Sequence, residues 1–190
     1  MTPGPETSST SATKKMSQII LLYSTTDGHT REICKFLQQV IEQSGHRVTL
    51  ACIDDDPAVE LNDFEKIVIG ASIRYGKHSK KAVNFIKTYT PLLEQKPNAF
   101  FSVNVVARKA EKSQPETNPY LQKLLSQIEW KPRELAVFAG KIDYPKYSFW
   151  DRNMIRFIMW MTKGPTDPNS SIEFTDWEQV KKFAQLISKM

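Results

Sequence analysis

The chain has 190 residues and a formal net charge of +5, with 40% hydrophobic and 25% charged residues. This length fits one domain with a sizeable core, and the composition excludes wholesale disorder. The positive charge favours anionic partners such as phosphates, carboxylates, nucleic acid or acidic lipids, without choosing among them. No apolar run approaches the ~18 residues that span a bilayer, so an integral membrane protein is not expected.

The amino-terminal residues 1–15 are rich in Ser, Thr, Pro and Gly and show no apolar periodicity. We expect them to form a disordered tail or a scar of the expression vector. Residues 16–190 then form the folded domain.

The first apolar segment, Ile19 to Tyr23, is uninterrupted and is typical of a parallel strand buried on both faces. A polar turn, Ser24 to His29, follows it. From Thr30 the apolar residues recur at helical spacing until Gly45, which is expected to end the helix. Arg47 to Cys52 is predicted to be a short second strand.

Three further strands are predicted at Lys66 to Ala71, Ala99 to Val106 and Leu135 to Ala139. A loop, Ser72 to Ser79, and a helix interrupted at Pro91 follow the first of them. Another helix runs through Leu121, Leu124, Leu125 and Ile128, and the last covers Asp176 to Lys189. This alternation predicts an α/β fold with a doubly wound, parallel five-stranded sheet. Residues 141–171 do not follow this alternation of strands and helices, so we expect them to form an insertion in or after the fifth strand.

The two cysteines, Cys34 and Cys52, have a spacing that matches no metal-binding motif. We therefore expect no metal site, no structural disulfide and a reducing compartment. Each thiol is interpreted as a small core residue.

Hydroxyl groups and a glycine gather where the first strand turns into the first helix, in YSTTDGHT (Tyr23 to Thr30). Backbone N–H groups and the helix dipole converge at such a turn, which can bind phosphate. An ordinary Ser/Thr-capped turn is the alternative.

This turn resembles the flavodoxin signature, which is carried here by Leu21, Leu22, Tyr23, Thr25, Gly28 and Thr30. Asp27 and Cys34 depart from the usual threonine and alanine. Because an Asp carboxylate would repel a phosphate, Asp27 is expected to offer its backbone N–H and to point its side chain elsewhere. His29 is expected to be a loop donor to phosphate or solvent, with a proton-sharing role as the alternative.

The resemblance implies the flavodoxin-like fold and FMN as the cofactor, bound at the switch point between strands one and three. The loops after strands one, three and four then supply the contacts, with Tyr75 able to cover the ring. The residues so implied are Ser24, Thr25, Thr26, Asp27, Gly28, His29, Thr30, Ser72, Ile73, Arg74, Tyr75, Gly76, Asn104, Val105, Val106, Ala107 and Arg108.

Five blocks in order give a narrower resemblance, to the flavodoxin-like, menaquinone-dependent protoporphyrinogen IX dehydrogenases. These blocks are STTDGHTREI (24–33), VIGASIRYG (68–76), FSVNVVARK (101–109), DYPKY (143–147) and FTDWEQV (174–180). The resemblance implies FMN-dependent oxidation of protoporphyrinogen IX to protoporphyrin IX in haem biosynthesis, with electrons passed to menaquinone or a related quinone. Because FMN carries the chemistry, no catalytic acid or base is assigned.

The substrate of that family bears two propionates, which basic side chains can hold. Arg74 and Arg108 are the first candidates, with Lys77 and Lys109 beside them. The alternative is that all four are solvated loop charges.

The insertion contains WDRNMIRFIMWMT, Trp150 to Thr162, predicted to be an amphipathic helix. Trp150, Met154, Phe157, Ile158 and Met161 share one face and Arg152 and Arg156 another, while Ile155, Met159 and Trp160 also need cover. This pattern suits a membrane surface or a groove for porphyrin and quinone, and a helix packed on its own core is the alternative. Because menaquinone resides in lipid, the family resemblance implies a cytoplasmic location on the surface of the inner, quinone-bearing membrane.

Three other functions stay open. A flavodoxin-type electron carrier would bind FMN without a substrate of its own, and an NAD(P)H:quinone reductase of the same fold would be reduced by NADPH. A flavin-free signalling domain has least support, since it requires an acidic cluster at the end of the first strand. Nucleic acid is not expected as a partner.

Overall fold

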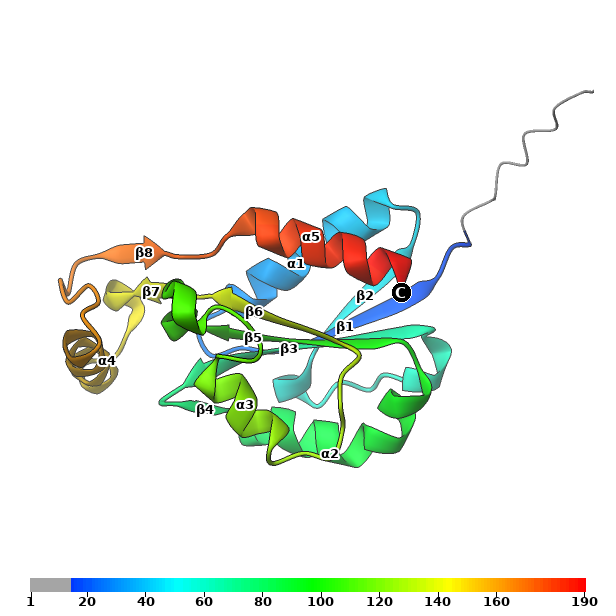
Figure 1. Cartoon of the computed structure of the whole chain (residues 1–190), viewed down its shortest axis with the longest axis horizontal. Helices are drawn as coiled ribbons and strands as arrows, with labels where there is room; N and C mark the ends of the chain where they lie inside the picture. Colours follow the sequence, from blue (N-terminus) through cyan, green and yellow to red (C-terminus); the bar gives the residue numbers. More distant parts are fainter. Residues whose placement is uncertain (1–14) are drawn as a thin grey trace, which may run out of the picture.

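A computed structural model describes residues 15–190. The tail expected at residues 1–15 lies outside the described residues, apart from Lys15. The main sheet has five parallel strands in the order β2-β1-β3-β5-β6, which confirms the predicted fold class (Figure 1). These strands are β1 (Gln18–Ser24), β2 (Arg47–Cys52), β3 (Lys66–Arg74), β5 (Asn98–Asn104) and β6 (Glu134–Ala139).

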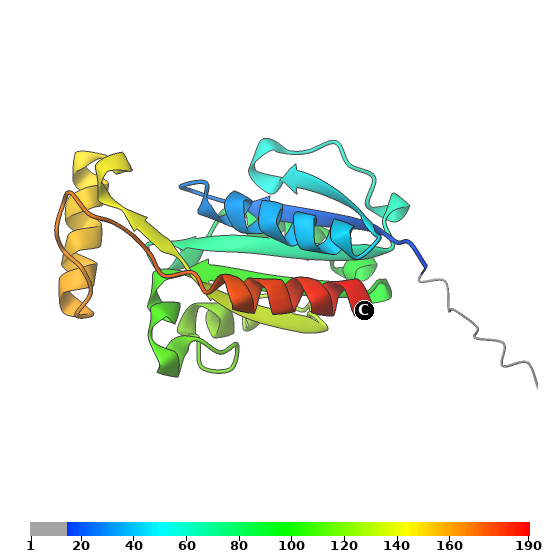
Figure 2. The ribbon, with the colours of Figure 1, turned by 90° about the horizontal axis from the view of Figure 1, so that it is seen from above.

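Helices cover both faces of the sheet, which is why its strands are apolar throughout. The helices α1 (His29–Gln43) and α5 (Trp177–Lys189) pack on one face (Figure 2). The other face is covered by α2 (Lys80–Gln95) and α3 (Pro119–Leu125). Alternate residues of a strand enter opposite cores, so Phe101 packs beneath α1 and α5 and Phe100 faces α2 and α3. Cys34 is buried, as predicted, and Cys52 is half-buried against the same core.

The strand order places the carboxyl ends of β1, β3 and β5 next to one another. The chain leaves β1 and β3 for opposite faces of the sheet, which opens a crevice between their ends. Three connections therefore meet at this edge: residues 25–28 after β1, the turn after β3, and the short 3₁₀ helix Val105–Arg108 after β5.

The segment after β3 is a hairpin, so the loop predicted for Ser72 to Ser79 is wrong. The strand continues to Arg74 and pairs antiparallel with β4 (Lys77–His78). Tyr75 and Gly76 connect them with φ angles of 49° and 73°. Two successive positive φ values are the geometry of a two-residue type I′ turn, whose twist matches that of the flanking strands.

Two predicted boundaries also need correction. Helix α2 runs through Pro91 to Gln95, because the buried Leu93 anchors its last turn while Pro91 is exposed. The strand expected to reach Val106 ends at Asn104. The side chain of Asn104 accepts a hydrogen bond from the backbone N–H of Ala107 at 3.1 Å, which favours the 3₁₀ turn over a longer strand.

The insertion stands at one end of the molecule, beyond the edge where the three connections meet (Figures 1 and 2). An antiparallel ribbon of β7 (Lys141–Asp143) and β8 (Ser171–Glu173) carries the helix α4 (Phe149–Met161). It has a small core of its own, in which Tyr144, Tyr147 and Met159 are buried. Within the part of the chain that the structure describes, no helix has the length and apolarity of a membrane span.

Candidate functional site

The turn after β1 has the form of an anion site. Gly28 adopts φ 86°, and its N–H donates to the hydroxyl of Thr25 at 3.0 Å. The first N–H groups of α1 follow it and have no acceptor within the helix. The Thr30 hydroxyl is fully buried and is without a hydrogen-bond partner among the described residues. A buried, unpaired hydroxyl at a helix amino terminus is what a phosphate group would satisfy, so the residues present fit FMN here.

Asp54 holds this turn in place, and sequence reasoning missed it. Its carboxylate accepts hydrogen bonds from the Ser24 hydroxyl at 3.0 Å and from the Thr25 N–H at 3.1 Å. The Ser24 hydroxyl also lies 2.8 Å from that of Ser79 at the start of α2. The sequence does show an acidic run after β2, Asp54 to Asp56. Its spacing gives no indication that one of these carboxylates binds a turn 30 residues earlier.

The side chain of His29 is not a free loop donor, so that prediction is wrong. One ring nitrogen lies 2.9 Å from the Glu32 carboxylate and the other lies 2.6 Å from the Thr175 hydroxyl. The Thr175 hydroxyl in turn donates to the carbonyl of Ala139 at 2.8 Å. The imidazole therefore ties α1 to the segment before α5.

Arg74 connects the turn after β1 to the insertion. Its guanidinium lies 2.8 Å from the Asp27 carboxylate and 3.1 Å from that of Asp151 on α4. The rings of Tyr75 and Tyr147 flank it, with centroids 5.3 and 5.2 Å from the guanidinium carbon. The Tyr75 hydroxyl also bonds to Asp151. The Asp27 side chain thus points to Arg74, and burial raises the pKa of this carboxyl although Arg74 opposes the shift.

Arg108 makes the corresponding link at the other end of α4. Its guanidinium donates to the carbonyl of Val105 at 3.1 Å and to the carbonyl and hydroxyl of Thr162 at 3.1 and 3.2 Å. Burial lowers the pKa of this group. Both arginines selected from the sequence are thus hydrogen bonded within the protein.

A cavity of about 130 Å³ lies between these connections and α4. Its lining is largely apolar and aromatic and is suited to a flat ring. The sequence predicted the residues that the hairpin and the turn after β5 contribute. It missed the wall supplied by the insertion and α3, namely Tyr120, Lys141, Ile142, Tyr147, Ile155, Ile158, Met159 and Thr162.

The remaining predicted residues lie outside this lining. Those from the turn after β1 are Ser24, Thr25, Thr26, Gly28, His29 and Thr30. Ser72 belongs to β3 and Ala107 to the 3₁₀ helix after β5, and neither lines the cavity. Lys77 belongs to β4 and Lys109 follows the 3₁₀ turn, and neither lines the cavity.

A buried polar network positions the turn after β5 and was also missed. The amide of Asn118 donates to the side-chain oxygen of Asn104 at 3.1 Å. Ser102 joins the network through Asn104 at 3.3 Å and through the His78 imidazole at 3.1 Å. Asn118 also caps α3, since its side chain accepts from the N–H of Leu121. The Asn118-Pro119 pair is a helix-start signal, but it does not indicate that Asn118 pairs with Asn104 of β5.

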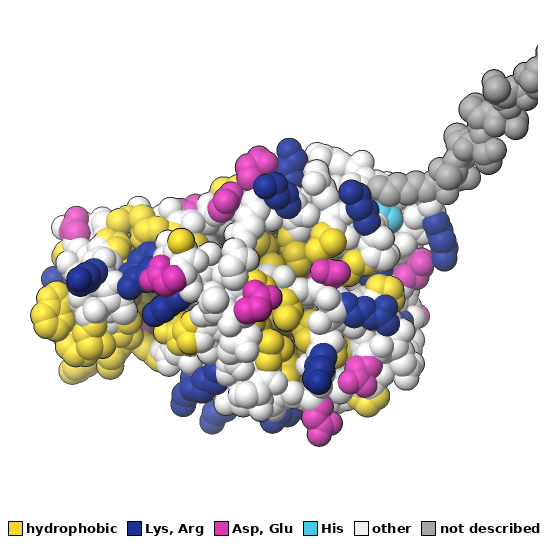
Figure 3. Space-filling view, in the orientation of Figure 1, with side chains coloured by type: hydrophobic (Ala, Val, Ile, Leu, Met, Phe, Trp, Pro, Cys, Tyr) yellow, Lys and Arg dark blue, Asp and Glu magenta, His cyan; other side chains and the backbone are white. Residues whose placement is uncertain are grey.

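Helix α4 presents its apolar side outward and its arginines inward. Arg156 donates to the carbonyl of Thr166 at 2.9 Å, and Arg152 to that of Tyr147 at 3.5 Å. Trp150 is 81% exposed and Trp160 is 70% exposed. Arg152 and Arg156 are half-buried against backbone carbonyls of the insertion, whereas Trp150 is exposed, so the arginines and the exposed apolar residues lie on separate faces as predicted. Figure 3 shows the resulting apolar surface over α4 at one end of the molecule.

Comparisons with known proteins agree with this geometry. The Flavodoxin domain family matches residues 20–169. Protoporphyrinogen IX dehydrogenase [quinone] of Leishmania major is 44% identical over 166 residues, covering 87% of this chain and 72% of that protein. The protein of the same name from Escherichia coli K12 is 41% identical over 171 residues, covering 90% and 94%.

The chain belongs to the protoporphyrinogen IX dehydrogenase [quinone] family of flavodoxin-domain proteins. Solved structures support the fold. Oxidised flavodoxin 1 from Bacillus cereus has a TM-score of 0.50 at 14% identity, covering 91% of this chain and 98% of that one. A short-chain flavodoxin associated with a bacterial microcompartment has a TM-score of 0.51 at 12% identity, covering 92% and 98%.

Proposed function

We propose that this protein is an FMN-dependent dehydrogenase that oxidises protoporphyrinogen IX to protoporphyrin IX and passes the electrons to a quinone. The supporting observation is identity of 41–44% to dehydrogenases of that name over about nine-tenths of the chain. The anion turn and the adjoining apolar cavity have the chemistry that a flavin phosphate and ring require.

Different segments of the chain would bind the phosphate and the ring of FMN. The turn from Thr25 to Thr30 would take the phosphate, and the backbone of Asn104 to Arg108 with the Tyr75 ring would hold the flat ring. When bound, FMN supplies the two-electron redox chemistry. The protein itself positions the reactants and excludes water, since α4 covers the cavity and is fastened at both ends by Arg74 and Arg108.

The proposed activity is tested by following porphyrin fluorescence during anaerobic turnover of purified, FMN-loaded protein. Protoporphyrinogen IX with a menaquinone analogue should give fluorescent product at a rate proportional to enzyme. We propose menaquinone as the acceptor, so a ubiquinone analogue of equal tail length should support slower turnover. Prompt bleaching of the flavin by NADPH, with no porphyrin formed, would support a quinone reductase instead.

We further propose that α4 docks on the surface of the quinone-bearing membrane. Trp150, Phe157 and Trp160 are exposed in one short helix, an arrangement that is costly in water and suited to a lipid interface. Because Arg152 and Arg156 face inward, apolar contact and not attraction to anionic lipid would contribute most of the membrane affinity. Quinones with isoprenoid tails reside in lipid, so this surface would bring the cavity beside the acceptor.

Replacing both Trp150 and Trp160 by serine tests this membrane surface. Binding to liposomes in sedimentation should fall by at least tenfold, since each buried indole contributes about 1.5–3 kcal/mol. The FMN content should stay unchanged. A control in which Tyr89, also partly exposed but on α2, becomes serine should bind liposomes as the wild type does. Undiminished binding of the double variant would contradict docking through α4.

A further inference from the structure

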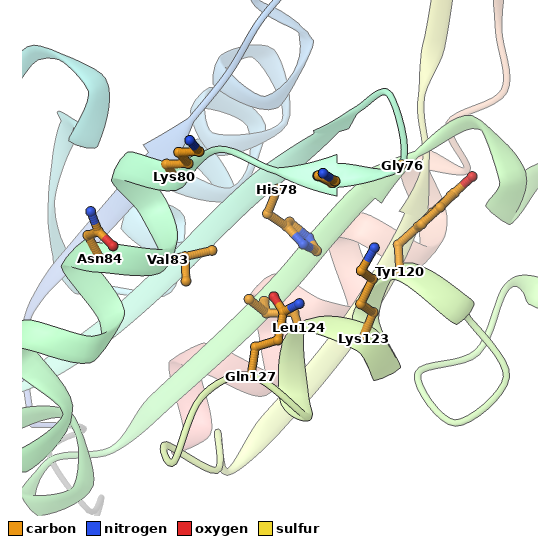
Figure 4. A pocket seen from close by; sticks show the side chains of 10 residues that line it. Gly76, His78, Lys80, Val83, Asn84, Tyr120, Lys123, Leu124 and Gln127 are labelled. Carbon is orange, nitrogen blue, oxygen red and sulfur yellow. The ribbon is translucent and has the colours of Figure 1, made fainter.

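A second cavity lies on the other side of the β3–β4 turn from the cavity of about 130 Å³ described above, which we call the flavin-loop cavity. It has a volume of about 340 Å³ and is bounded by β4, α2 and α3 (Figure 4). Gly76 and Tyr120 line both cavities. A Cβ atom on Gly76 would lie 3.5 Å from the Tyr120 ring, so these two residues form a thin shared wall. A ligand that extends past this wall reaches both spaces.

The second cavity carries positive charge that the protein does not offset. Lys77 on β4, Lys80 in the first turn of α2 and Lys123 on α3 all line it. Among the described residues, none of the three has an ion pair with a carboxylate. Such a group of uncommitted ammonium ions attracts anionic groups.

The rest of the lining is apolar or neutral. Val83 and Leu124 contribute apolar surface. The imidazole of His78 points into the space, with Lys123 and Tyr120 beyond it (Figure 4). Burial lowers the pKa of His78 to about 4, so this ring is uncharged at neutral pH. The cavity therefore offers a cationic rim around an apolar interior, which fits a carboxylate-bearing aromatic or pyrrolic ligand.

The two arginines nearer the flavin-loop cavity cannot bind a substrate carboxylate without breaking hydrogen bonds inside the protein. Arg74 is paired with Asp27 and Asp151, and Arg108 is bonded to the carbonyl of Thr162. A substrate carboxylate would have to displace these partners. The lysines of the second cavity need displace only water.

We propose that the second cavity binds the propionate carboxylates of the tetrapyrrole substrate, with Lys77 and Lys123 as the main partners and Lys80 at the rim. This inference rests on the proposed dehydrogenase function and specifies where the anionic edge of its substrate lies. The macrocycle would then pass over the Gly76–Tyr120 wall toward the flavin-loop cavity.

The test compares a double variant, Lys77→Gln with Lys123→Gln, with a control of equal charge change, Lys35→Gln with Lys181→Gln. The control lysines are exposed on α1 and α5, on the opposite face of the sheet. Binding of protoporphyrin IX and of its dimethyl ester to FMN-loaded protein is measured by fluorescence, together with the KM for protoporphyrinogen IX. The double variant should bind the diacid about five- to tenfold more weakly and show a matching rise in KM. Ester binding, FMN content and the control should be unaffected.

Three results would overturn the inference. The double variant could bind the diacid as tightly as the wild type, or lose diacid and ester equally, which would indicate lost packing and not lost charge recognition. The control could also weaken diacid binding equally, which would indicate a general effect of net charge. Each of these leaves the proposed function standing if the wild type still oxidises protoporphyrinogen IX. A wild type that neither oxidises the porphyrinogen nor binds the diacid would overturn both.

Discussion

Replacing Thr30 by valine tests the anion turn, because the structure predicts opposite effects on stability and on binding. The Thr30 hydroxyl is fully buried and has no protein partner among the described residues. An unsatisfied buried polar group costs about 1–3 kcal/mol, and valine has nearly the same shape. The flavin-free variant should therefore be more stable to urea than the wild type by up to that amount.

The same substitution removes a hydrogen bond to a charged phosphate, which contributes about 1.5–3 kcal/mol. The Kd for FMN should rise roughly ten- to 150-fold, measured by quenching of flavin fluorescence during titration. Thr88→Val on the exposed surface of α2 is the control and should change neither quantity. A less stable flavin-free variant, or an unchanged Kd, would refute the assignment of Thr30 to the phosphate.

Two further predictions concern the insertion and the second cavity. Arg108→Ala should loosen the carboxyl end of α4, so limited proteolysis within residues 148–164 should become faster while unfolding of the sheet changes little; an unchanged digestion rate would show that Arg108 does not hold the helix. His78 has a folded pKa of about 4 against 6.5 in the unfolded chain, so the unfolded state binds the additional proton as the pH falls. Stability should therefore decline between pH 6.5 and 4, by on the order of 3 kcal/mol, and His78→Gln should flatten this decline in urea unfolding. A wild type that is equally stable at both ends of this range would contradict the burial of a neutral imidazole.

The strands and the anion turn could be predicted because their signals are local. An uninterrupted apolar run such as Ile19 to Tyr23 is sufficient to indicate a strand covered on both faces. The hairpin after β3 escaped prediction because its turn begins with Tyr75, where a positive φ is unusual for a residue with a large side chain. Asn or Gly at position 75 would have indicated a type I′ hairpin turn.

The wall of the candidate site could not be predicted because it depends on contacts between distant segments. Asp54 is one acidic residue among several until β2 pairs with β1 and brings it beneath Ser24 and Thr25. The outward face of α4 was ambiguous for a similar reason. Both sides of that helix carry apolar residues, and carbonyl groups elsewhere in the insertion decide that Arg152 and Arg156 turn inward.

The most direct test of the proposed function is anaerobic reduction and reoxidation of the protein, followed by flavin absorbance and porphyrin fluorescence together. Mixing FMN-loaded protein with protoporphyrinogen IX should bleach the flavin, which takes up the electrons of one two-electron oxidation. Because the complete oxidation to protoporphyrin IX takes three such steps, subsequent addition of a menaquinone analogue in excess should restore the flavin absorbance and allow porphyrin fluorescence to appear. A flavin that protoporphyrinogen IX leaves oxidised, and that only NADPH or a protein reductant can bleach, would contradict the account.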